Sequence, residues 1–291
     1  MKTPIFMVGL PRSGTTWIAS VLGATAGTSY FHEPFNDHNV PESAPFAMRY
    51  LRASDNDPKF ASYCRKCFAG RQRHPAVKPR GQKWWQRLPG FTRVLIKDVH
   101  SALALDWISR HIAPKIVILM RHPLAVADSW LRVFGRDRDD GRISSRLLGQ
   151  PALLDDYLRP YEEHIRSADS TAGRAGVYWG ACYHVLLTQQ RAHPDWIVVR
   201  HEDFCDDPSG RFHDLCDRLG LRWTARAEQL LMDSNSQDSG HPYVPRRILA
   251  NEKDKWRKTL TREQQDAVVR AVRPFNIPGY EMPDLKLPLV A

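Results

Sequence analysis

Five short apolar runs, separated by stretches of helical periodicity, constrain the fold of this chain more than any other feature of its sequence. Two of them, at 94–96 and 116–119, are continuously apolar, as expected for strands that are buried on both faces of a sheet. Strands that alternate with helices along a chain favour an α/β fold, in which helices cover a mostly parallel sheet. The runs predict strands at 4–9, 29–31, 93–97, 115–120 and 196–200.

Helical segments fill the gaps between the predicted strands. In the first of them, Ile18, Val21 and Leu22 lie on one apolar stripe. Two others begin at clear signals, because Asp207 precedes a proline at the first helical position and Thr261 opens a capping box. The predicted helices are 14–24, 102–112, 123–133, 172–193, 207–219 and 261–272.

The length and hydropathy of the chain indicate how it is organised. Its 291 residues suit one α/β domain, so we expect a single domain over 1–291. The stretches at about 58–92 and 135–160 fit neither pattern and are interpreted as insertions over the working edge of the sheet. No apolar stretch reaches the roughly 18 residues of a membrane span. The apolar run after Lys2 is too short for a signal-peptide core, so we expect a cytoplasmic protein.

The cysteines do not suggest a disulfide framework, because there are five of them and no secretory signal. Cys64 and Cys67 form a single CxxC pair, which could bind zinc only with two ligands from elsewhere, such as His74. We therefore interpret the cysteines as buried or idle thiols and expect no metal site.

Positive charge is concentrated in one segment. The net charge is +10, and ten Lys and Arg residues lie between 58 and 93 without a single Asp or Glu. The positive electrostatic field of such a segment attracts anions, which include nucleotides, sulfated sugars, nucleic acid and acidic lipid. The segment also carries aromatic residues, among them Trp84 and Trp85, which suit stacking on a sugar or an anionic acceptor. A solvent-exposed basic cover without a ligand is the alternative.

The strongest functional signal is the segment from Gly9 to Trp17, which follows an apolar strand and opens an amphipathic helix. Backbone N–H groups and the positive end of the helix dipole would converge there on one anion, which predicts a phosphate site. The spacing of Gly9 and Gly14 is similar to that of a Walker A loop, but Thr15 occupies the position of the ATPase lysine. The cation of this loop is Arg12, and that departure weakens the interpretation as a kinase.

The run 11–17 resembles the 5′-phosphosulfate loop of sulfotransferases that use 3′-phosphoadenosine 5′-phosphosulfate (PAPS), in which Lys or Arg precedes Ser-Gly-Thr-Thr. A second motif of that family is a strand ending in Arg and followed by a helix that bears Ser, and Arg121 and Ser129 match it. The resemblance implies a three-layer, P-loop-like fold and the transfer of a sulfuryl group from PAPS to an acceptor hydroxyl. The nucleotide contacts that it implies are Arg12, Ser13, Gly14, Thr15, Thr16, Trp17, Arg121 and Ser129.

The physical setting of Arg121 supports this match. It stands at the carboxyl end of a predicted strand, where open α/β sheets bind ligands. Ser129 follows two turns into a helix, so a guanidinium and a hydroxyl could converge on the 3′-phosphate. Trp17 would either stack on adenine or belong to the core.

Two further segments match the family less closely. Lys97 occupies the position of an acceptor-side lysine, and His100 lies one residue beyond the place where some members carry a catalytic histidine. Arg247 and Trp256 correspond to residues of the C-terminal loop that folds over the nucleotide, although the glycines of that loop are absent here. The resemblance extends from residue 4 to about 270.

Sulfuryl transfer is expected to resemble phosphoryl transfer, so that catalysis is mostly positioning and electrostatics around an in-line transition state. Arg12, Thr15 and Thr16 would stabilise the departing 5′-phosphate, and Lys97 would contact the sulfuryl oxygens. The leaving group is a single phosphate that a loop can neutralise, so no metal ion is required.

Glu33 is the candidate general base. It follows Arg12 by 21 residues (33 − 12), a spacing similar to that in protein-tyrosine and several carbohydrate sulfotransferases. We expect partial burial to raise the pKa of Glu33 and so to let it accept the acceptor proton. Pairing with a basic neighbour is the alternative, and His32 and His100 are rival bases.

Two other functions fit parts of the sequence. A P-loop kinase of small molecules would use ATP and Mg²⁺, but it would need a lysine at position 15. A non-catalytic nucleic-acid-binding protein would use the basic segment and would bind less tightly as salt rises, but it leaves the motifs at 12–17 and 121–129 unexplained. A sulfotransferase is therefore preferred, and its acceptor could be a sugar, lipid, phenol or peptide hydroxyl in a protein of open oligomeric state.

Overall fold

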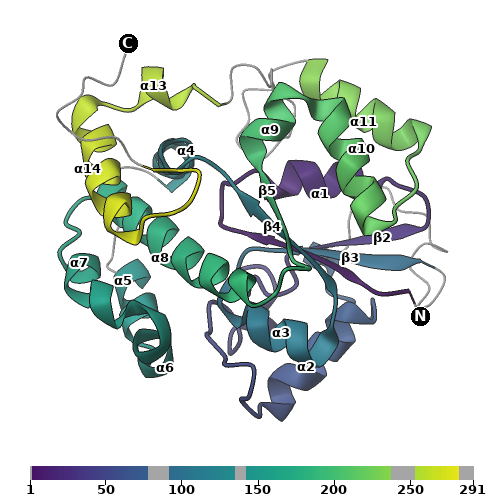
Figure 1. Ribbon diagram of the computed structural model, residues 1–291. Coiled ribbons are helices and arrows are strands. Elements are labelled where there is room, and N and C mark those ends of the chain that lie inside the picture. Colours follow the sequence, from purple (N-terminus) through teal and green to yellow (C-terminus); the bar gives the residue numbers. More distant parts are fainter. Residues whose placement is uncertain (1, 78–91, 135–141, 237–252, 282–291) are drawn as a thin grey trace. The chain divides into compact units, whose positions relative to one another are not determined.

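The computed structural model describes residues 2–77, 92–134, 142–236 and 253–281 (Figure 1). These residues form two compact units. The first comprises Met1–Met120 and His193–Ala250, and the second comprises Arg121–Ala192 and Asn251–Ala291. The first unit contains the sheet, and the described part of the second unit is helical. That the whole chain acts as one domain stays a prediction.

A five-stranded sheet organises the first unit, in the order β2-β3-β1-β4-β5, and every neighbouring pair is parallel. Lys97 of β3 pairs with Met7 of the central strand on one side and with His32 of β2 on the other. Parallel strands end at the same edge, so the residues that follow β1, β2 and β3 lie near one another. All five predicted strands are confirmed: β1 Ile5–Gly9, β2 Thr28–His32, β3 Arg93–Asp98, β4 Lys115–Met120 and β5 Ile197–Arg200.

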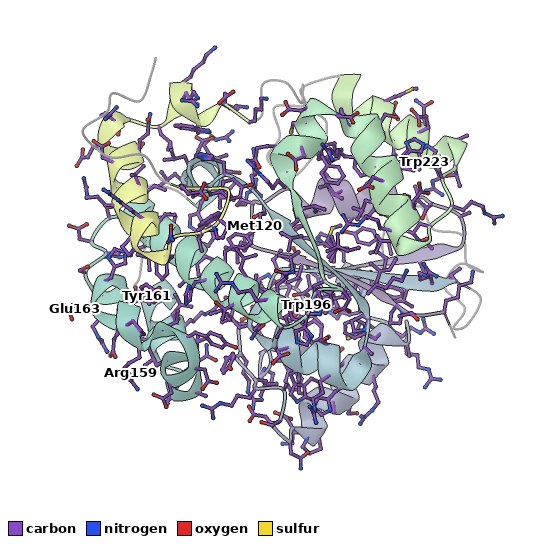
Figure 2. The ribbon with its side chains drawn as sticks, viewed as in Figure 1. Met120, Arg159, Tyr161, Glu163, Trp196 and Trp223 are labelled. Carbon is purple, nitrogen blue, oxygen red and sulfur yellow. The ribbon has the colours of Figure 1, made fainter. Side chains whose placement is uncertain are left out.

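One face of the sheet carries four helices (Figure 1), whose buried side chains form a single core with alternate strand residues such as Ile5 and Met7. Phe212 packs edge-on against Trp17 in that core, with ring centroids 5.5 Å apart. Trp223 covers the rim of this layer (Figure 2). The helices are α1 Thr15–Gly23, α9 His201–Asp206, α10 Pro208–Leu219 and α11 Ala225–Ser236. The sequence predicted α1 and α10 but not α9 or α11.

The opposite face carries α2 (Pro58–Phe68) and α3 (Leu105–Ile112) (Figure 1). Phe68 of α2 packs edge-on against Phe6 of β1, with centroids 5.4 Å apart. The predicted helix at 102–112 is confirmed in two pieces, because a 3₁₀ turn precedes α3. The 3₁₀ turns of this unit are η1 Pro41–Ser43, η2 Pro75–Val77 and η4 Ala102–Ala104.

The first part of 58–92, which fitted neither pattern in the sequence, forms the regular helix α2, and the interpretation of 58–92 as an insertion stays a prediction. Asp57 caps α2 by accepting a hydrogen bond from the Phe60 N–H (2.8 Å), and Pro58 takes the first helical position. The same Asp-Pro signal was read correctly before α10. The many Lys and Arg residues hid an apolar stripe that includes Phe60 and Phe68, both buried. Residues 78–91, with Trp84 and Trp85, lie outside the described part.

In the second unit, α8 (Thr171–Arg191) packs against α14 (Arg262–Val272). Two glycines of α8 permit this close approach. A Cβ at Gly176 would lie 2.8 Å from that of Ala271, and one at Gly180 would overlap the ring of Phe275. The other elements are α4 Pro123–Phe134, α5 Arg142–Leu148, α6 Pro151–Leu153, η5 Leu154–Leu158, η6 Arg159–Tyr161, α7 Glu162–Arg166, α13 Trp256–Thr259 and η7 Arg273–Phe275.

These elements confirm the predicted helices at 123–133, 172–193 and 261–272. The capping box of α14 is formed, because the Thr261 hydroxyl accepts from the Gln264 N–H and the Gln264 side chain accepts from the Thr261 N–H. The described part of 135–160 is also helical rather than irregular, which the sequence pattern did not reveal.

All five cysteines are buried, and none forms a disulfide. Burial raises the pKa of both Cys64 and Cys67, so these thiols stay protonated at neutral pH. The prediction of buried thiols is therefore confirmed. Among the described residues, no group of His, Cys, Asp and Glu is arranged to hold a metal ion. The described helices include none that is both long and apolar enough to cross a membrane.

Candidate active site

The predicted phosphate loop connects β1 to α1. β1 ends at Gly9, and Gly14 precedes the first residue of α1 in a left-handed conformation (φ 87°). Arg12 is also left-handed, with φ 71°. The Ser13 N–H donates to the carbonyl of Leu10 (3.2 Å) and closes the turn. The strand–turn–helix geometry that an anion site needs is therefore present.

Side chains of the loop alternate in their exposure. Arg12 and Thr16 are half-buried, whereas Ser13 and Thr15 are buried. The loop thus offers one guanidinium and one hydroxyl for direct contact with a ligand, and its buried hydroxyls shape the turn.

Two close approaches require glycine in this loop. A Cβ at Gly9 would lie 2.7 Å from the carbonyl oxygen of Leu119 on β4. A Cβ at Gly14 would overlap the imidazole of His201, the first residue of α9. His201 is 4% exposed and lies beside the loop. His201 was not predicted as a site residue, although it directly follows the fifth strand and therefore lies at the carboxyl edge of the sheet.

Trp17 belongs to the core of the first unit. Its side chain is 6% exposed, and its Nε1 donates to the Ser234 hydroxyl of α11 (2.9 Å). Rings of His201, Phe204 and Phe212 pack edge-on around the indole. This packing accounts for Trp17 without a ligand, and its contact with adenine stays a prediction.

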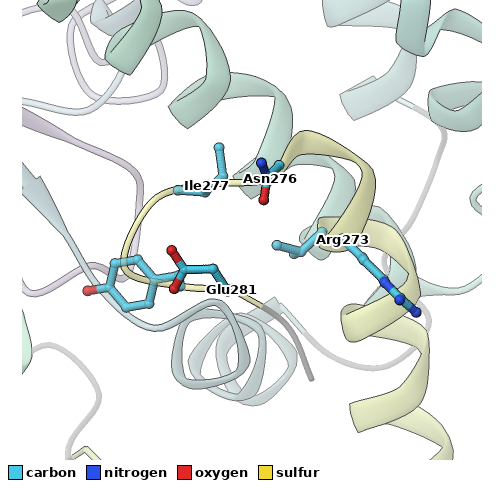
Figure 3. Close-up of a pocket in the computed structure, with 6 residues that line it drawn as sticks. Arg273, Asn276, Ile277 and Glu281 are labelled. Atoms are coloured by element: carbon cyan, nitrogen blue, oxygen red, sulfur yellow. The ribbon is translucent and has the colours of Figure 1, made fainter. Parts of the chain in front are cut away.

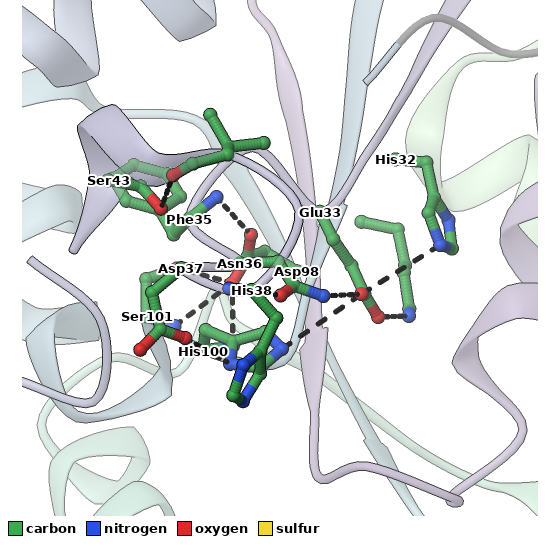
Figure 4. Close-up of polar contacts among 12 residues, drawn as sticks. His32, Glu33, Phe35, Asn36, Asp37, His38, Ser43, Asp98, His100 and Ser101 are labelled. Atoms are coloured by element: carbon green, nitrogen blue, oxygen red, sulfur yellow. Dashed lines mark hydrogen bonds and ion pairs between the residues drawn. The ribbon is translucent and has the colours of Figure 1, made fainter. Parts of the chain in front are cut away.

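Glu33 and Lys97 form a buried ion pair at the ends of β2 and β3 (Figure 4). The Lys97 ammonium contacts Oε1 of Glu33, and the two side chains are 3% and 14% exposed. The Glu33 N–H donates to the Lys97 carbonyl (2.7 Å), which extends the β2–β3 pairing by one residue. Glu33 has φ 44°, so the chain turns sharply here and directs the carboxylate toward β3.

Polar side chains surround the other oxygen of Glu33. The Asn36 amide donates to Oε2 (2.7 Å), and Nε2 of His32 and of His100 lie 3.8 and 4.0 Å from it (Figure 4). His100 also faces Asp37, with its Nδ1 4.0 Å from Oδ1. The structure therefore gathers Glu33, Lys97 and both rival histidines into one cluster.

The expectation that burial raises the pKa of Glu33 was wrong for this arrangement. Burial does favour the neutral acid, but the positive charge of Lys97 and its hydrogen bond outweigh it and lower the pKa of Glu33 to about 2. Burial and the charge of Lys97 also lower the pKa of His32 to about 4. At neutral pH the cluster therefore contains an ionised Glu33, paired with Lys97, beside a neutral His32, and the function of Glu33 as general base stays a prediction.

Asp98 holds the backbone of this cluster in place. Its carboxylate accepts from the N–H groups of Phe35 (2.8 Å), His100 (2.7 Å) and Ser101 (3.0 Å) (Figure 4). Asp98 is fully buried, and burial raises its pKa. It ties the segment after β2 to the segment after β3, a function that no sequence motif indicated.

The phosphate loop and the Glu33–Lys97 pair thus lie at the carboxyl edge of one parallel sheet. The sequence of residues 4–225, well over half of the chain, matches the model of the Sulfotransferase family. The chain belongs to the sulfotransferase family. It is an enzyme of sulfuryl transfer, and the kinase and nucleic-acid-binding alternatives are not favoured.

Solved structures of sulfotransferases are similar to this one. The sulfotransferase domain of the olefin synthase from Synechococcus PCC 7002 is 20% identical, with a TM-score of 0.53 over 97% of this chain and 98% of that chain. The sulfotransferase domain from the curacin biosynthetic pathway is 16% identical, with a TM-score of 0.50 over 97% and 99%. This likeness confirms the three-layer, P-loop-like α/β fold. No curated protein sequence matches the chain significantly.

The remaining predicted residues of the sulfotransferase site belong to the second unit or lie outside the described residues. Arg121 and Ser129 are 4% and 2% exposed. Trp256 is buried, with its indole stacked on His122 (centroids 5.2 Å apart) and the guanidinium of Arg257 4.5 Å from the ring centre. Arg247 lies outside the described residues.

A small cavity of about 210 Å³ lies at the C-terminal end of α14 (Figure 3). None of the predicted site residues lines it. Its lining residues are Val272, Arg273, Asn276, Ile277, Tyr280 and Glu281. It is therefore separate from the residues that the sequence assigned to catalysis.

Proposed function

We propose that this sulfotransferase takes its sulfuryl group from PAPS and transfers it to an acceptor hydroxyl at the carboxyl edge of the sheet. The observation that carries the proposal is that the phosphate loop follows β1 while the Glu33–Lys97 pair lies at the carboxyl ends of β2 and β3, with β3 next to β1. Sulfuryl transfer requires binding of the nucleotide, neutralisation of the charge on the transferring group and removal of the acceptor proton. The anion loop, the Lys97 cation and the Glu33 carboxylate at one edge would supply these three functions.

The loop is proposed to hold the 5′-phosphosulfate. Arg12 and Thr16, which are half-buried, would contact the phosphate directly, and the N–H groups at the start of α1 would complete its ligation. Ser13, Gly14 and Thr15 would shape the loop. Negative charge grows on the 5′-phosphate as the sulfur–oxygen bond breaks, so a preformed positive cradle favours the transition state.

Arg121 and Ser129 are proposed to bind the 3′-phosphate, which distinguishes PAPS from other adenine nucleotides. A guanidinium supplies two parallel N–H donors to a phosphate, and a hydroxyl supplies a third. Ser129 lies within α4, the helix that starts two residues after Arg121. That Trp256 and Arg247 contact the nucleotide stays a prediction.

The buried pair suggests how proton removal is timed. A carboxylate with a pKa of about 2 accepts a proton poorly. The sulfuryl oxygens of the donor would compete with Glu33 for hydrogen bonds from the Lys97 ammonium. When Lys97 turns toward the donor, its positive charge stabilises the Glu33 carboxylate less, and the pKa of Glu33 would rise. The acceptor oxygen then bonds to sulfur, the bond from sulfur to the 5′-phosphate breaks, and the acceptor proton passes to Glu33. His100, with its Nε2 4.0 Å from Glu33, is the second candidate base.

A thermal-shift experiment tests the donor. Adenosine 3′,5′-bisphosphate, AMP and ATP–Mg²⁺ would each be added in turn, and a ligand at 100 times its dissociation constant stabilises by about 2.7 kcal/mol. We expect strong stabilisation by the bisphosphate alone, without metal. Arg12→Ala should lose this response, whereas Arg110→Ala, an exposed arginine of α3, should keep it. Equal stabilisation by AMP would remove the function proposed for Arg121 and Ser129.

The cytoplasmic location stays a prediction.

A further inference from the structure

A hydrogen bond from a buried tryptophan fixes the backbone of Arg121. The Nε1 of Trp179, on α8, donates to the carbonyl oxygen of Arg121 at 2.9 Å. Trp179 is fully buried, and both residues belong to the second unit. Nothing in the family motifs singled out Trp179, which lies 58 residues along the chain from Arg121.

Aromatic rings pack around Trp179 and around His122, the residue that follows Arg121. Tyr280 packs edge-on against Trp179 (5.5 Å) and against His122 (5.9 Å), and Trp256 stacks on His122. Tyr183, one turn further along α8, packs on Trp179 with centroids 4.8 Å apart. These contacts leave the Trp179 ring little freedom, so its N–H is a fixed point for the Arg121 carbonyl.

The turn that Trp179 holds also starts the helix of Ser129. The Leu124 N–H, in the first turn of α4, donates to Nδ1 of His122 (3.3 Å). α4 packs against α8, the helix that carries Trp179. A shift of the Arg121 carbonyl would therefore move the Cα atom from which the Arg121 side chain extends. It would also move the start of the helix that bears Ser129.

We propose that Trp179 is a positioning residue for recognition of the donor's 3′-phosphate, acting through the backbone of Arg121. The inference rests on the proposed function, in which Arg121 and Ser129 bind that phosphate. Trp179 itself need not touch the nucleotide. Trp179 would hold the Arg121 backbone in the one position from which the Arg121 guanidinium and the Ser129 hydroxyl both reach the 3′-phosphate. Bidentate contacts weaken with small displacements, so this position matters for affinity.

The test compares two ligands that differ by the 3′-phosphate. Dissociation constants of adenosine 3′,5′-bisphosphate and of AMP are measured by calorimetry, and their ratio isolates what the 3′-phosphate contributes. Trp179→Phe keeps an aromatic ring and removes the N–H donor. We expect this variant to reduce the ratio about fivefold or more, the equivalent of one lost hydrogen bond, with the affinity for AMP unchanged.

Trp107→Phe is the matched control. Trp107 is also buried, and its Nε1 also donates to a backbone carbonyl, but to that of Asp55 (2.8 Å) in the first unit rather than to that of Arg121. It should lower stability to a similar extent and leave the ratio unchanged. An unchanged ratio in Trp179→Phe, or an equal reduction in both variants, would overturn the inference.

Arg121→Ala separates this inference from the proposed function. If Arg121→Ala abolishes the preference for the bisphosphate while Trp179→Phe does not, the inference fails and the proposed function stands. If Arg121→Ala has no effect, the proposed function itself fails. Should Trp179→Phe not fold, the Nε1–H resonance of Trp179 in the wild-type protein, assigned from nuclear Overhauser spectra, must shift on addition of the bisphosphate and not of AMP. Equal shifts with both ligands would overturn the inference.

Discussion

The Lys97 ammonium is buried against the Glu33 carboxylate, and this contact joins the ends of two neighbouring parallel strands. Each residue was proposed for a separate step, Lys97 for the sulfuryl oxygens and Glu33 for the acceptor proton. Because each neutralises the other in the free enzyme, neither step can be altered by mutation without an effect on the other. The predictions for this cluster therefore need paired variants.

Glu33→Gln should abolish most turnover while keeping the nucleotide site intact. We expect a loss of about 10²- to 10⁴-fold in kcat, the usual contribution of a general base, with the same thermal shift on adding the bisphosphate. Glu263→Gln, an exposed glutamate of α14, is the control for loss of one carboxylate. Normal turnover in Glu33→Gln would transfer the function of base to His100.

A double-mutant cycle of Glu33→Gln and Lys97→Met should show strong coupling in the free energy of unfolding. Either single variant leaves a buried charge without its partner, whereas the double variant removes both charges. We expect a coupling of about 0.5–3 kcal/mol by chemical denaturation. The exposed pair of Lys66 and Glu42, 3.2 Å apart, should show a much smaller coupling. Additive effects at Glu33 and Lys97 would mean that the pair does not form in solution.

The pH dependence of stability should show two separate windows. The pKa of Glu33 is lowered from 4.5 to about 2 in the fold, so its stabilisation is present above pH 4.5 and is lost as pH falls toward 2. The pKa of His32 is lowered from 6.5 to about 4, so the unfolded chain binds a proton first and stability falls between pH 6.5 and 4.

Denaturation curves at stepwise pH check both windows. Glu33→Gln should flatten the lower window, and His32→Gln should flatten the upper one. The converse result, in which Glu33→Gln alters stability mainly near pH 6, would contradict the lowered pKa of Glu33.

Gly14→Ala should abolish donor binding, and Gly27→Ala should not. Both glycines have positive φ, 87° and 65°, so alanine costs on the order of 1 kcal/mol at either position. At Gly14 the new Cβ would also overlap His201, whereas at Gly27 its nearest neighbour is the flexible end of Lys2, 3.7 Å away. We expect at least a tenfold loss of bisphosphate affinity by calorimetry in Gly14→Ala alone. Similar affinity in both variants would show that the loop does not bind the phosphate.

Features that depend on neighbours in sequence were predicted well. The strands at β1, β3 and β4 are continuous apolar runs, and the turn from Gly9 to Thr15 is encoded by glycines and hydroxyls within seven residues. The capping box at Thr261 needs residues three apart. Patterns of this kind depend on the backbone preferences and the hydropathy of a few neighbouring residues, and both can be read from a short segment.

Features that depend on composition over a long segment were predicted poorly. α2 was missed because ten basic residues in 58–93 outweighed a correct Asp-Pro signal at its start, and α11 was missed because its apolar residues are few. In both helices the buried residues recur at helical spacing between charged and polar ones. They are Phe60, Tyr63, Cys64, Cys67 and Phe68 in α2 and Ala227, Leu231 and Ser234 in α11. The mean hydropathy of such a segment therefore does not reveal its buried face.

The sequence by itself determined the parallel α/β sheet, the phosphate loop and the candidates Glu33, Lys97 and His100. Tertiary structure alone decided that Lys97 neutralises Glu33, that His201 packs on Gly14, and that Trp179 binds the Arg121 carbonyl. Each of these contacts joins residues that are far apart in the chain. The order of strands and the packing of helices bring them together, and no local pattern encodes either, so the charge state of the candidate base could not be read before the fold was known.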